Sequence, residues 1–118
     1  MSRLPLSEQI LNLQAGSLFQ QWVVTELFNR INYLGRQYRL YFWRTVSGAE
    51  VDVILETPKE LIPIEVKWTD NPRPADARHL HSFLAEFPRR AKRGFIVCRA
   101  PRRLQMSERV TAIPWQDM

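Results

Sequence analysis

Only one cysteine, Cys98, occurs in the 118 residues, so an internal disulfide is impossible and a metal site built from several cysteines is excluded. It lies in the apolar run 94–98, where a small buried hydrophobe is expected rather than a nucleophile. No apolar run approaches the roughly 20 residues that a membrane helix needs, and the start of the chain has no apolar stretch of signal-peptide length. We therefore expect a cytoplasmic protein with no membrane partner.

Internal repeats, low-complexity tracts and the phosphate-binding motif G-x-x-x-x-G-K-[ST] are also missing. Without that motif the chain cannot hydrolyse a nucleotide in the way that P-loop enzymes do. The length suits one domain with a modest core, and a hydrophobic content of 45% is typical of a globular protein.

Basic charge is concentrated in the second half of the chain. Residues 1–70 carry seven Lys/Arg against eight Asp/Glu, whereas residues 71–118 carry ten against four, for a net charge of +5 overall. Seven of those ten basic residues lie close together in sequence: Arg89, Arg90, Lys92, Arg93, Arg99, Arg102 and Arg103. Such a cluster attracts polyanions, and nucleic acid is the partner we expect, although charge density alone is explained more simply by a solvated surface.

The order of predicted elements indicates an α/β fold in which helices pack on a sheet. Residues 1–15 form a weakly patterned lead-in, a short helix or an arm, before a single domain over 16–118. The expected helices are 16–34 and 75–87, and the expected strands are 38–45, 50–56, 61–68, 94–99 and 110–114. On the first helix the apolar stripe is centred on Val24, Leu27, Ile31 and Leu34 and flanked by Phe19, Trp22, Val23 and Phe28.

Two carboxylates are expected to face each other across the second and third strands. A four-residue turn at 57–60 sets Asp52 opposite Glu65, and alternation puts both on one face with Glu50 and Lys67. The other face is an apolar floor of Val51, Val53, Leu55, Ile64 and Val66. The Cβ atoms of such a pair lie about 5 Å apart, and like charges there are destabilising.

Lys67 or a hard divalent cation with oxygen ligands could offset this repulsion. A Mg²⁺ or Mn²⁺ held by Asp52 and Glu65 would bind a phosphate oxygen and acidify a water, and Lys67 would orient that water or stabilise charge on phosphorus. The spacing alone fits equally well an ordinary ladder of charged residues on a solvated strand face.

Gln20 is a further candidate because it lies in line with the apolar stripe, at its N-terminal end. From there its amide can point over the sheet edge toward the carboxylates, or simply reach solvent. Glu26 lies on the polar side of the helix, four residues before Arg30, where an i,i+4 ion pair explains it. His79 and His81 are two residues apart and would be splayed by a helix, so a metal pair there is not expected.

Several segments carry a resemblance to a known family. Asp52 followed by Glu65-Val66-Lys67 resembles the D…ExK signature of the PD-(D/E)XK nuclease superfamily. The segments that look like one family within it are Gly16-Ser-Leu-Phe-Gln-Gln-Trp-Val-Val-Thr-Glu-Leu27, Tyr41-Phe-Trp-Arg44, Gly48-Ala-Glu-Val-Asp-Val-Ile-Leu55, Pro63-Ile-Glu-Val-Lys67 and Ala112-Ile-Pro-Trp115. That family is the uncharacterised C-terminal domain of predicted prokaryotic P-loop ATPases.

The resemblance implies a restriction-endonuclease-like αβββαβ core, a mixed sheet flanked by helices. It also implies a metal site of Asp52, Glu65 and the Val66 backbone carbonyl, with Lys67 as the catalytic lysine. Gln20 stands where the superfamily usually has an acid on the helix, and this neutral ligand should weaken metal affinity. The ATPase half is absent from the sequence, so a separate ATPase is one partner to expect.

Three functions remain open at this stage. The first is a Mg²⁺- or Mn²⁺-dependent nuclease that acts on DNA. The second is a DNA-binding module that keeps the fold and has lost the chemistry, which Gln20 favours. The third is a homodimerisation or protein-interaction domain that pairs through the aromatic strand 38–43. Whichever function holds, Trp43 and Trp68 are expected to be packing residues rather than base-stacking platforms.

Overall fold

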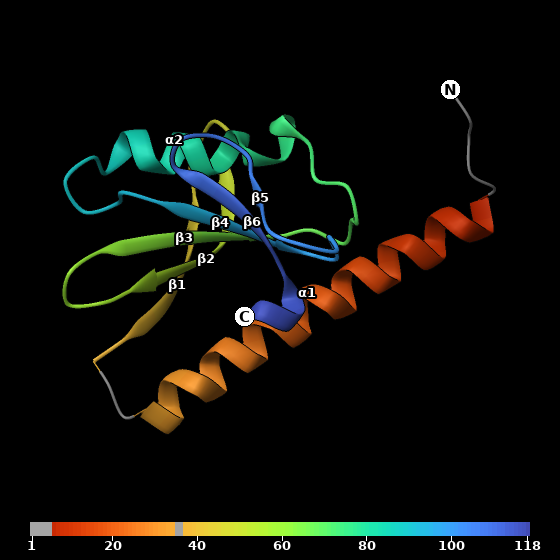
Figure 1. Cartoon of the computed structure of the whole chain (residues 1–118), viewed down its shortest axis with the longest axis horizontal. Coiled ribbons are helices and arrows are strands. Elements are labelled where there is room, and N and C mark those ends of the chain that lie inside the picture. The colour runs from red at the N-terminus through yellow and green to blue at the C-terminus, as the bar shows by residue number, and fades with distance from the viewer. Residues whose placement is uncertain (1–5, 35–36) are drawn as a thin grey trace.

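The computed structural model describes residues 6–34 and 37–118 (Figure 1). The elements in chain order are α1 (Leu6–Leu34), β1 (Arg39–Arg44), β2 (Glu50–Glu56), β3 (Leu61–Val66), α2 (Arg78–Glu86), β4 (Gly94–Cys98), β5 (Leu104–Gln105) and β6 (Val110–Pro114). Short 3₁₀ turns at Pro74–Ala77 and Trp115–Asp117 precede α2 and end the chain.

The six described strands form one mixed sheet in the order β1-β2-β3-β4-β6-β5. β1, β2 and β3 are an antiparallel meander, while β3, β4 and β6 are parallel, and β5 returns antiparallel to β6. α2 is the crossover between parallel β3 and β4. The expected α/β fold, with helices on a sheet and an αβββαβ order, is therefore confirmed.

Each face of the sheet is covered by one helix, so the core has two layers (Figure 1). On one face, Phe19 and Val23 of α1 pack against the sheet residues Val53, Ile62, Ile64, Val66, Val97 and Ile113. α2 covers the other, with Val51, Ile54, Leu80, Phe83, Leu84, Ile96, Val110 and Ala112 at its centre. Cys98 is buried and free in this second layer, as predicted.

The first helix begins earlier than predicted, because α1 already includes the residues from Leu6 onward that were expected as a lead-in. Residues 1–5 lie outside the described part. Gly16, inside the helix, lies against Trp68: a Cβ built on Gly16 would be 3.6 Å from the Trp68 Cβ atom. The helix continues through Gly16 because one glycine costs a helix interior only about 1 kcal/mol.

The buried side of α1 is also rotated from the predicted stripe. Among the α1 side chains that the structure describes, Phe19 and Val23 are buried, whereas Val24 and Leu27 are only partly buried and Phe28 is 55% exposed. Two of the predicted flanking residues are thus the true centre of the buried side. Leu34 belongs to α1, but its side chain lies outside the described part.

The remaining elements follow the predictions closely, with three differences. The predicted helix 75–87 opens as a 3₁₀ turn, where Pro74 lacks an N–H and Arg73 N–H donates to Asp76 Oδ2, and becomes α-helical from Arg78. β3 ends at Val66 instead of Trp68, and β5 was not predicted. Although α1 has 29 residues, no helix in the described part of the chain is long and apolar enough to cross a membrane.

Candidate metal and nucleic-acid site

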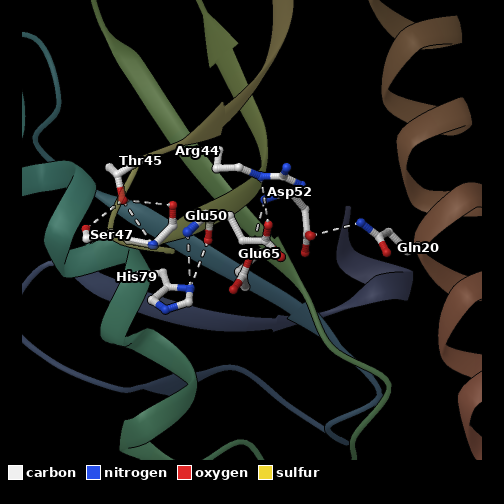
Figure 2. Close-up of polar contacts among 9 residues, drawn as sticks. Gln20, Arg44, Thr45, Ser47, Glu50, Asp52, Glu65 and His79 are labelled. Atoms are coloured by element: carbon white, nitrogen blue, oxygen red, sulfur yellow. Dashed lines mark hydrogen bonds and ion pairs between the residues drawn. The ribbon is translucent and has the colours of Figure 1, made fainter.

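The hairpin before β2 is fixed by local hydrogen bonds at Thr45. Its Oγ1 accepts from the Ala49 N–H at 3.0 Å and lies 3.0 Å from the Ser47 hydroxyl (Figure 2). Gly48 has φ +99°, a left-handed conformation that a side chain would strain. This turn sets where β2 starts and therefore where Asp52 lies.

The predicted register of β2 and β3 is confirmed. The pairs run from Glu56↔Leu61 to Val53↔Ile64, and the next step along the same ladder brings Asp52 to Glu65. The two carboxylates therefore come together where the paired part of β2 and β3 ends. This is also the carboxyl end of β3 and of its parallel neighbour β4, the edge at which open α/β sheets bind ligands.

The predicted alternation of β2 is wrong at Val51, because the β1–β2 ladder shifts there. Tyr41 pairs with Ile54 and Trp43 with Val51, so one residue of β1 is opposite two of β2, Asp52 and Val53. Val51 consequently packs in the α2 layer, whereas Val53 packs in the α1 layer. Such a β-bulge re-aims side chains, and here it affects Asp52. Leu55, Ile64 and Val66 pack with Val53 as predicted.

Each carboxylate is bound to the backbone of the opposite strand. Asp52 Oδ2 accepts from the Val66 N–H at 2.8 Å. Glu65 Oε1 accepts from the Asp52 N–H at 3.2 Å (Figure 2). These two bonds cross-link β2 to β3 beyond Val53 and Ile64, the last pair of the backbone ladder. Asp52 is half-buried and Glu65 only 6% exposed, so both side chains are held in defined positions.

Burial and the Asp52 charge raise the pKa of Glu65 to about 8. The positive charge of Lys67 acts in the opposite direction and lowers it. The predicted repulsion between the two carboxylates is therefore present, and the Lys67 charge offsets part of it. A proton on Glu65 relieves the remaining repulsion near neutral pH.

Gln20 reaches the pair from α1, on the face that covers β3. Its Nε2 donates to Asp52 Oδ1 at 2.8 Å, and Figure 2 shows the amide pointing from the helix to this carboxylate. The prediction that Gln20 points over the sheet edge toward the carboxylates thus holds, and the alternative of a side chain that only reaches solvent does not. If the side-chain amide flips, Nε2 and Oε1 exchange places, so the same side chain can also offer an oxygen.

The donor set fits a hard divalent cation. A carboxylate has about four lone-pair positions, and only two on Asp52 are used, by Gln20 and by Val66. In a strand the C=O of a residue points to the same side as its N–H, so the Val66 carbonyl also faces β2. Within residues 6–34 and 37–118, no group of three or more His, Cys, Asp or Glu is arranged to hold a metal. The predicted set of metal ligands contains only two acids and is completed by neutral oxygens, so it is not a group of that kind.

Other acidic residues near the site have partners of their own. Glu50 pairs with Arg44 at 3.4 Å, and its carbonyl oxygen lies 3.0 Å from His79 Nδ1 (Figure 2). Sequence reasoning missed His79 as a neighbour of the site because only the fold brings α2 to the start of β2. Glu26 forms the predicted ion pair with Arg30, at 3.9 Å.

The seven clustered basic residues do not form one patch. β4 separates them: Arg89, Arg90, Lys92 and Arg93 precede it, and Arg99, Arg102 and Arg103 follow it. Five residues of strand span about 17 Å. The second group lies at the carboxyl edge with the acidic pair. The first lies at the opposite edge, where Arg93 pairs with Glu60 at 3.1 Å and joins Lys59 and Tyr38 around an open cleft.

The two tryptophans predicted to pack differ in their surroundings. Trp43 makes an edge-to-face contact with Phe83 in the α2 layer, with centroids 5.2 Å apart. Trp68 is 37% exposed, contacts Phe19 at 5.2 Å and carries the Arg99 guanidinium over its ring. The first is core packing, and the second is at the rim of the candidate site.

Comparison with known proteins places the chain in a family. No curated protein matches it. Residues 15–118 match DUF4143, described as a domain of unknown function. This range contains the six described strands, α2 and most of α1, and with them the acidic pair, Gln20 and Lys67. The chain therefore belongs to the DUF4143 family.

Proposed function

We propose that this domain is a divalent-metal-dependent nuclease that binds DNA and hydrolyses its phosphodiester bonds. The proposal extends the DUF4143 match to the PD-(D/E)XK superfamily, on the resemblance of Asp52 and Glu65-Val66-Lys67 to its signature. The observation that carries it is the pair of acids bound across β2 and β3, with Lys67 beside them and Gln20 closing the site from α1.

Asp52, Glu65 and the Val66 carbonyl would hold Mg²⁺ or Mn²⁺ in this account, with Gln20 as a fourth, neutral contact. When bound, the cation would acidify water and offset charge on the phosphate. The reciprocal bonds to the backbone keep the two carboxylates in place, so little reorganisation is needed when the proton on Glu65 leaves. Lys67, which directly follows β3, would bind the phosphate and stabilise the charge that develops there.

DNA binding is attributed to the basic residues at the same edge, Arg99 and Arg102, with Arg103 partly occupied by Asp117 at 3.9 Å. Their position on the same edge of the sheet as the acidic pair supports a strand of DNA crossing the carboxyl ends of β3 and β4. Residues 89–93 are left out of this surface because β4 holds them at the opposite edge.

A second candidate is a DNA-binding module that has kept the fold and lost the chemistry. It is favoured by one observation: Gln20 and Val66 donate to both oxygens of Asp52, and Glu65 has a pKa of about 8, so the site is stable without a cation. Salt-dependent DNA binding that survives Glu65→Gln, with no cleavage in Mg²⁺ or Mn²⁺, is the result that this candidate predicts.

Two further expectations belong to the proposal. A partner ATPase follows from the resemblance to ATPase C-terminal domains, and a buried free thiol at Cys98 suits a reducing cytoplasm. Self-association through β1 is the alternative partner, because β1 is an edge strand with Tyr41 and Phe42 about half exposed.

Plasmid nicking tests the proposal. The wild-type domain is expected to nick supercoiled DNA in Mg²⁺ or Mn²⁺, and Asp52→Asn and Lys67→Ala are expected to lower the rate at least about 100-fold. Asp52→Asn is preferred to Asp52→Ala because asparagine keeps an acceptor for the Val66 N–H. Equal nicking by Asp52→Asn and wild type would show that the activity is a contaminant and would end the enzymatic proposal.

A further inference from the structure

Trp68 and Arg99 form a stacked pair beside the candidate metal site. The Arg99 guanidinium carbon lies 3.9 Å from the centroid of the Trp68 ring, which is close for a cation–π contact. Trp68 directly follows Lys67, and it contacts Phe19, the residue that precedes Gln20 on α1. The pair therefore adjoins the site along both α1 and β3.

Backbone hydrogen bonds fix the pair relative to the site. The Arg99 N–H donates to the Thr69 carbonyl at 2.8 Å, and the Lys67 N–H donates to the Val97 carbonyl at 3.0 Å. The residues on either side of Trp68 are thus tied to the end of β4 and to Arg99. Trp68 and Arg99 are held by the two central parallel strands rather than by a free loop.

Arg99 differs from the two other arginines that lie over an aromatic ring, Arg44 and Arg93, because each of those also pairs with a carboxylate. Arg30, Arg44, Arg93 and Arg103 each lie within 4 Å of a carboxylate. Among the residues that the structure describes, Arg99 has neither an ion pair nor a side-chain hydrogen bond, although it is exposed. An arginine held flat by a tryptophan keeps its N–H edges open to an oxyanion.

We propose that Arg99, positioned by Trp68, is a phosphate-binding residue that holds a DNA phosphate next to the one that would be cleaved. A guanidinium binds two phosphate oxygens in parallel through its planar N–H fork, and stacking on Trp68 reduces the entropy lost on binding. Arg99 contributes affinity and the register of the strand, and Trp68 acts through Arg99 as a positioning residue. This inference rests on the proposed function for its substrate, DNA.

The test is the salt dependence of binding to a short DNA duplex in Ca²⁺, measured by fluorescence anisotropy. Loss of one phosphate contact lowers the slope of log K against log salt by about 0.9 and is expected to weaken binding about tenfold for Arg99→Ala. Arg99→Lys is expected to keep the slope and to recover only part of the affinity, because lysine lacks the planar fork. Arg109→Ala is the matched control, since Arg109 is exposed and lies just before β6, at the opposite edge of the sheet.

Two results would overturn the inference. One is an unchanged slope for Arg99→Ala, and the other is an equal loss of slope for Arg99→Ala and Arg109→Ala, which would indicate only general charge. Trp68→Phe keeps a ring against Phe19 and should weaken binding less than Arg99→Ala does.

Failure of this inference is distinguishable from failure of the proposed function. If wild type nicks DNA and Arg99→Ala leaves both KM and the slope unchanged, the phosphate contact is wrong and the nuclease stands. If wild type never nicks DNA but Arg99→Ala lowers the slope as expected, the contact stands and the nuclease is wrong. When both hold, Arg99→Ala raises KM with little change in kcat.

Discussion

Gln20 Nε2 donates a hydrogen bond of 2.8 Å to Asp52 Oδ1, and this bond joins the middle of α1 to the bulge in β2. The neutral amide fills the place where the PD-(D/E)XK resemblance leads one to expect an acid. It satisfies Asp52 without adding charge to a pair whose second member, Glu65, already has a raised pKa. The bond therefore stabilises the metal-free site.

Gln20→Glu should exchange this stability for metal affinity. A third carboxylate adds repulsion and removes the donor to Asp52, so we expect the metal-free protein to lose about 1–2 kcal/mol and the affinity for Mn²⁺ to rise about tenfold. Thermal unfolding with and without Mn²⁺ measures both effects. Gln21→Glu is the control, because Gln21 is exposed on the same turn of α1. The same response in both variants would show that Gln20 is not at a metal site.

Glu65 should make stability fall as the pH rises. Its pKa is raised from 4.5 to about 8 in the folded state, so between these values the folded protein binds more protons than the unfolded chain. Stability is then lost with rising pH over this window. Glu65→Gln is expected to flatten the dependence and to be more stable than wild type at pH 8 by on the order of 2 kcal/mol. Denaturant unfolding across the window checks this, with the exposed Glu86→Gln as control.

Gly16→Ala should stabilise the domain. A Cβ at this position would lie 3.6 Å from the Trp68 Cβ atom, an ordinary contact, and alanine is favoured over glycine in a helix by up to about 1 kcal/mol. A rise in Tm of a few degrees is expected for a domain of this size. A fall in Tm would mean that α1 must approach β3 more closely than the structure has it.

DNA binding should depend on one half of the basic cluster. Arg99→Glu/Arg102→Glu and Arg89→Glu/Lys92→Glu change the net charge equally, but only the first pair lies at the carboxyl edge with the acids. We expect the first double variant to lose at least about 30-fold in affinity and the second to lose less than about threefold, because a Debye length of about 8–10 Å screens the distant pair. Equal losses would contradict the separation of the cluster by β4.

The pairing of Asp52 with Glu65 could be predicted from the sequence because two short-range features determine it. The four-residue turn at 57–60 fixes the register of β2 and β3, and the alternation of β3 follows from its buried residues. Gln20 is a candidate for a similar reason, since a polar residue in line with an apolar stripe can point to the same side, and the hydrogen bond to Asp52 decides between this position and one in solvent. The positions of Asp52 and Glu65 were thus predicted from periodicity and turn length.

The predictions that the structure corrects concern features that the periodicity of apolar residues does not reveal. The bulge that turns Val51 to the α2 layer depends on how β1 pairs with β2, and neither strand signals it alone. Residues 89–103 form one cluster in the sequence even though a strand is predicted at 94–99, because the sequence does not show which edge of the sheet each end of that strand reaches. β5 has two residues and is held by its pairing with β6, so it has no pattern of its own. All three features are determined by how strands distant in the sequence pair in the sheet.

Calorimetric titration of Mn²⁺ into the wild-type domain and into Asp52→Asn measures the central claim directly, because it needs neither DNA nor turnover. We predict that wild type binds one Mn²⁺ with proton release between pH 6 and 8, as Glu65 ionises from a pKa of about 8, and that Asp52→Asn binds at least about tenfold more weakly. No binding to the folded wild type, or equal binding by both proteins, would contradict a metal site at the acidic pair.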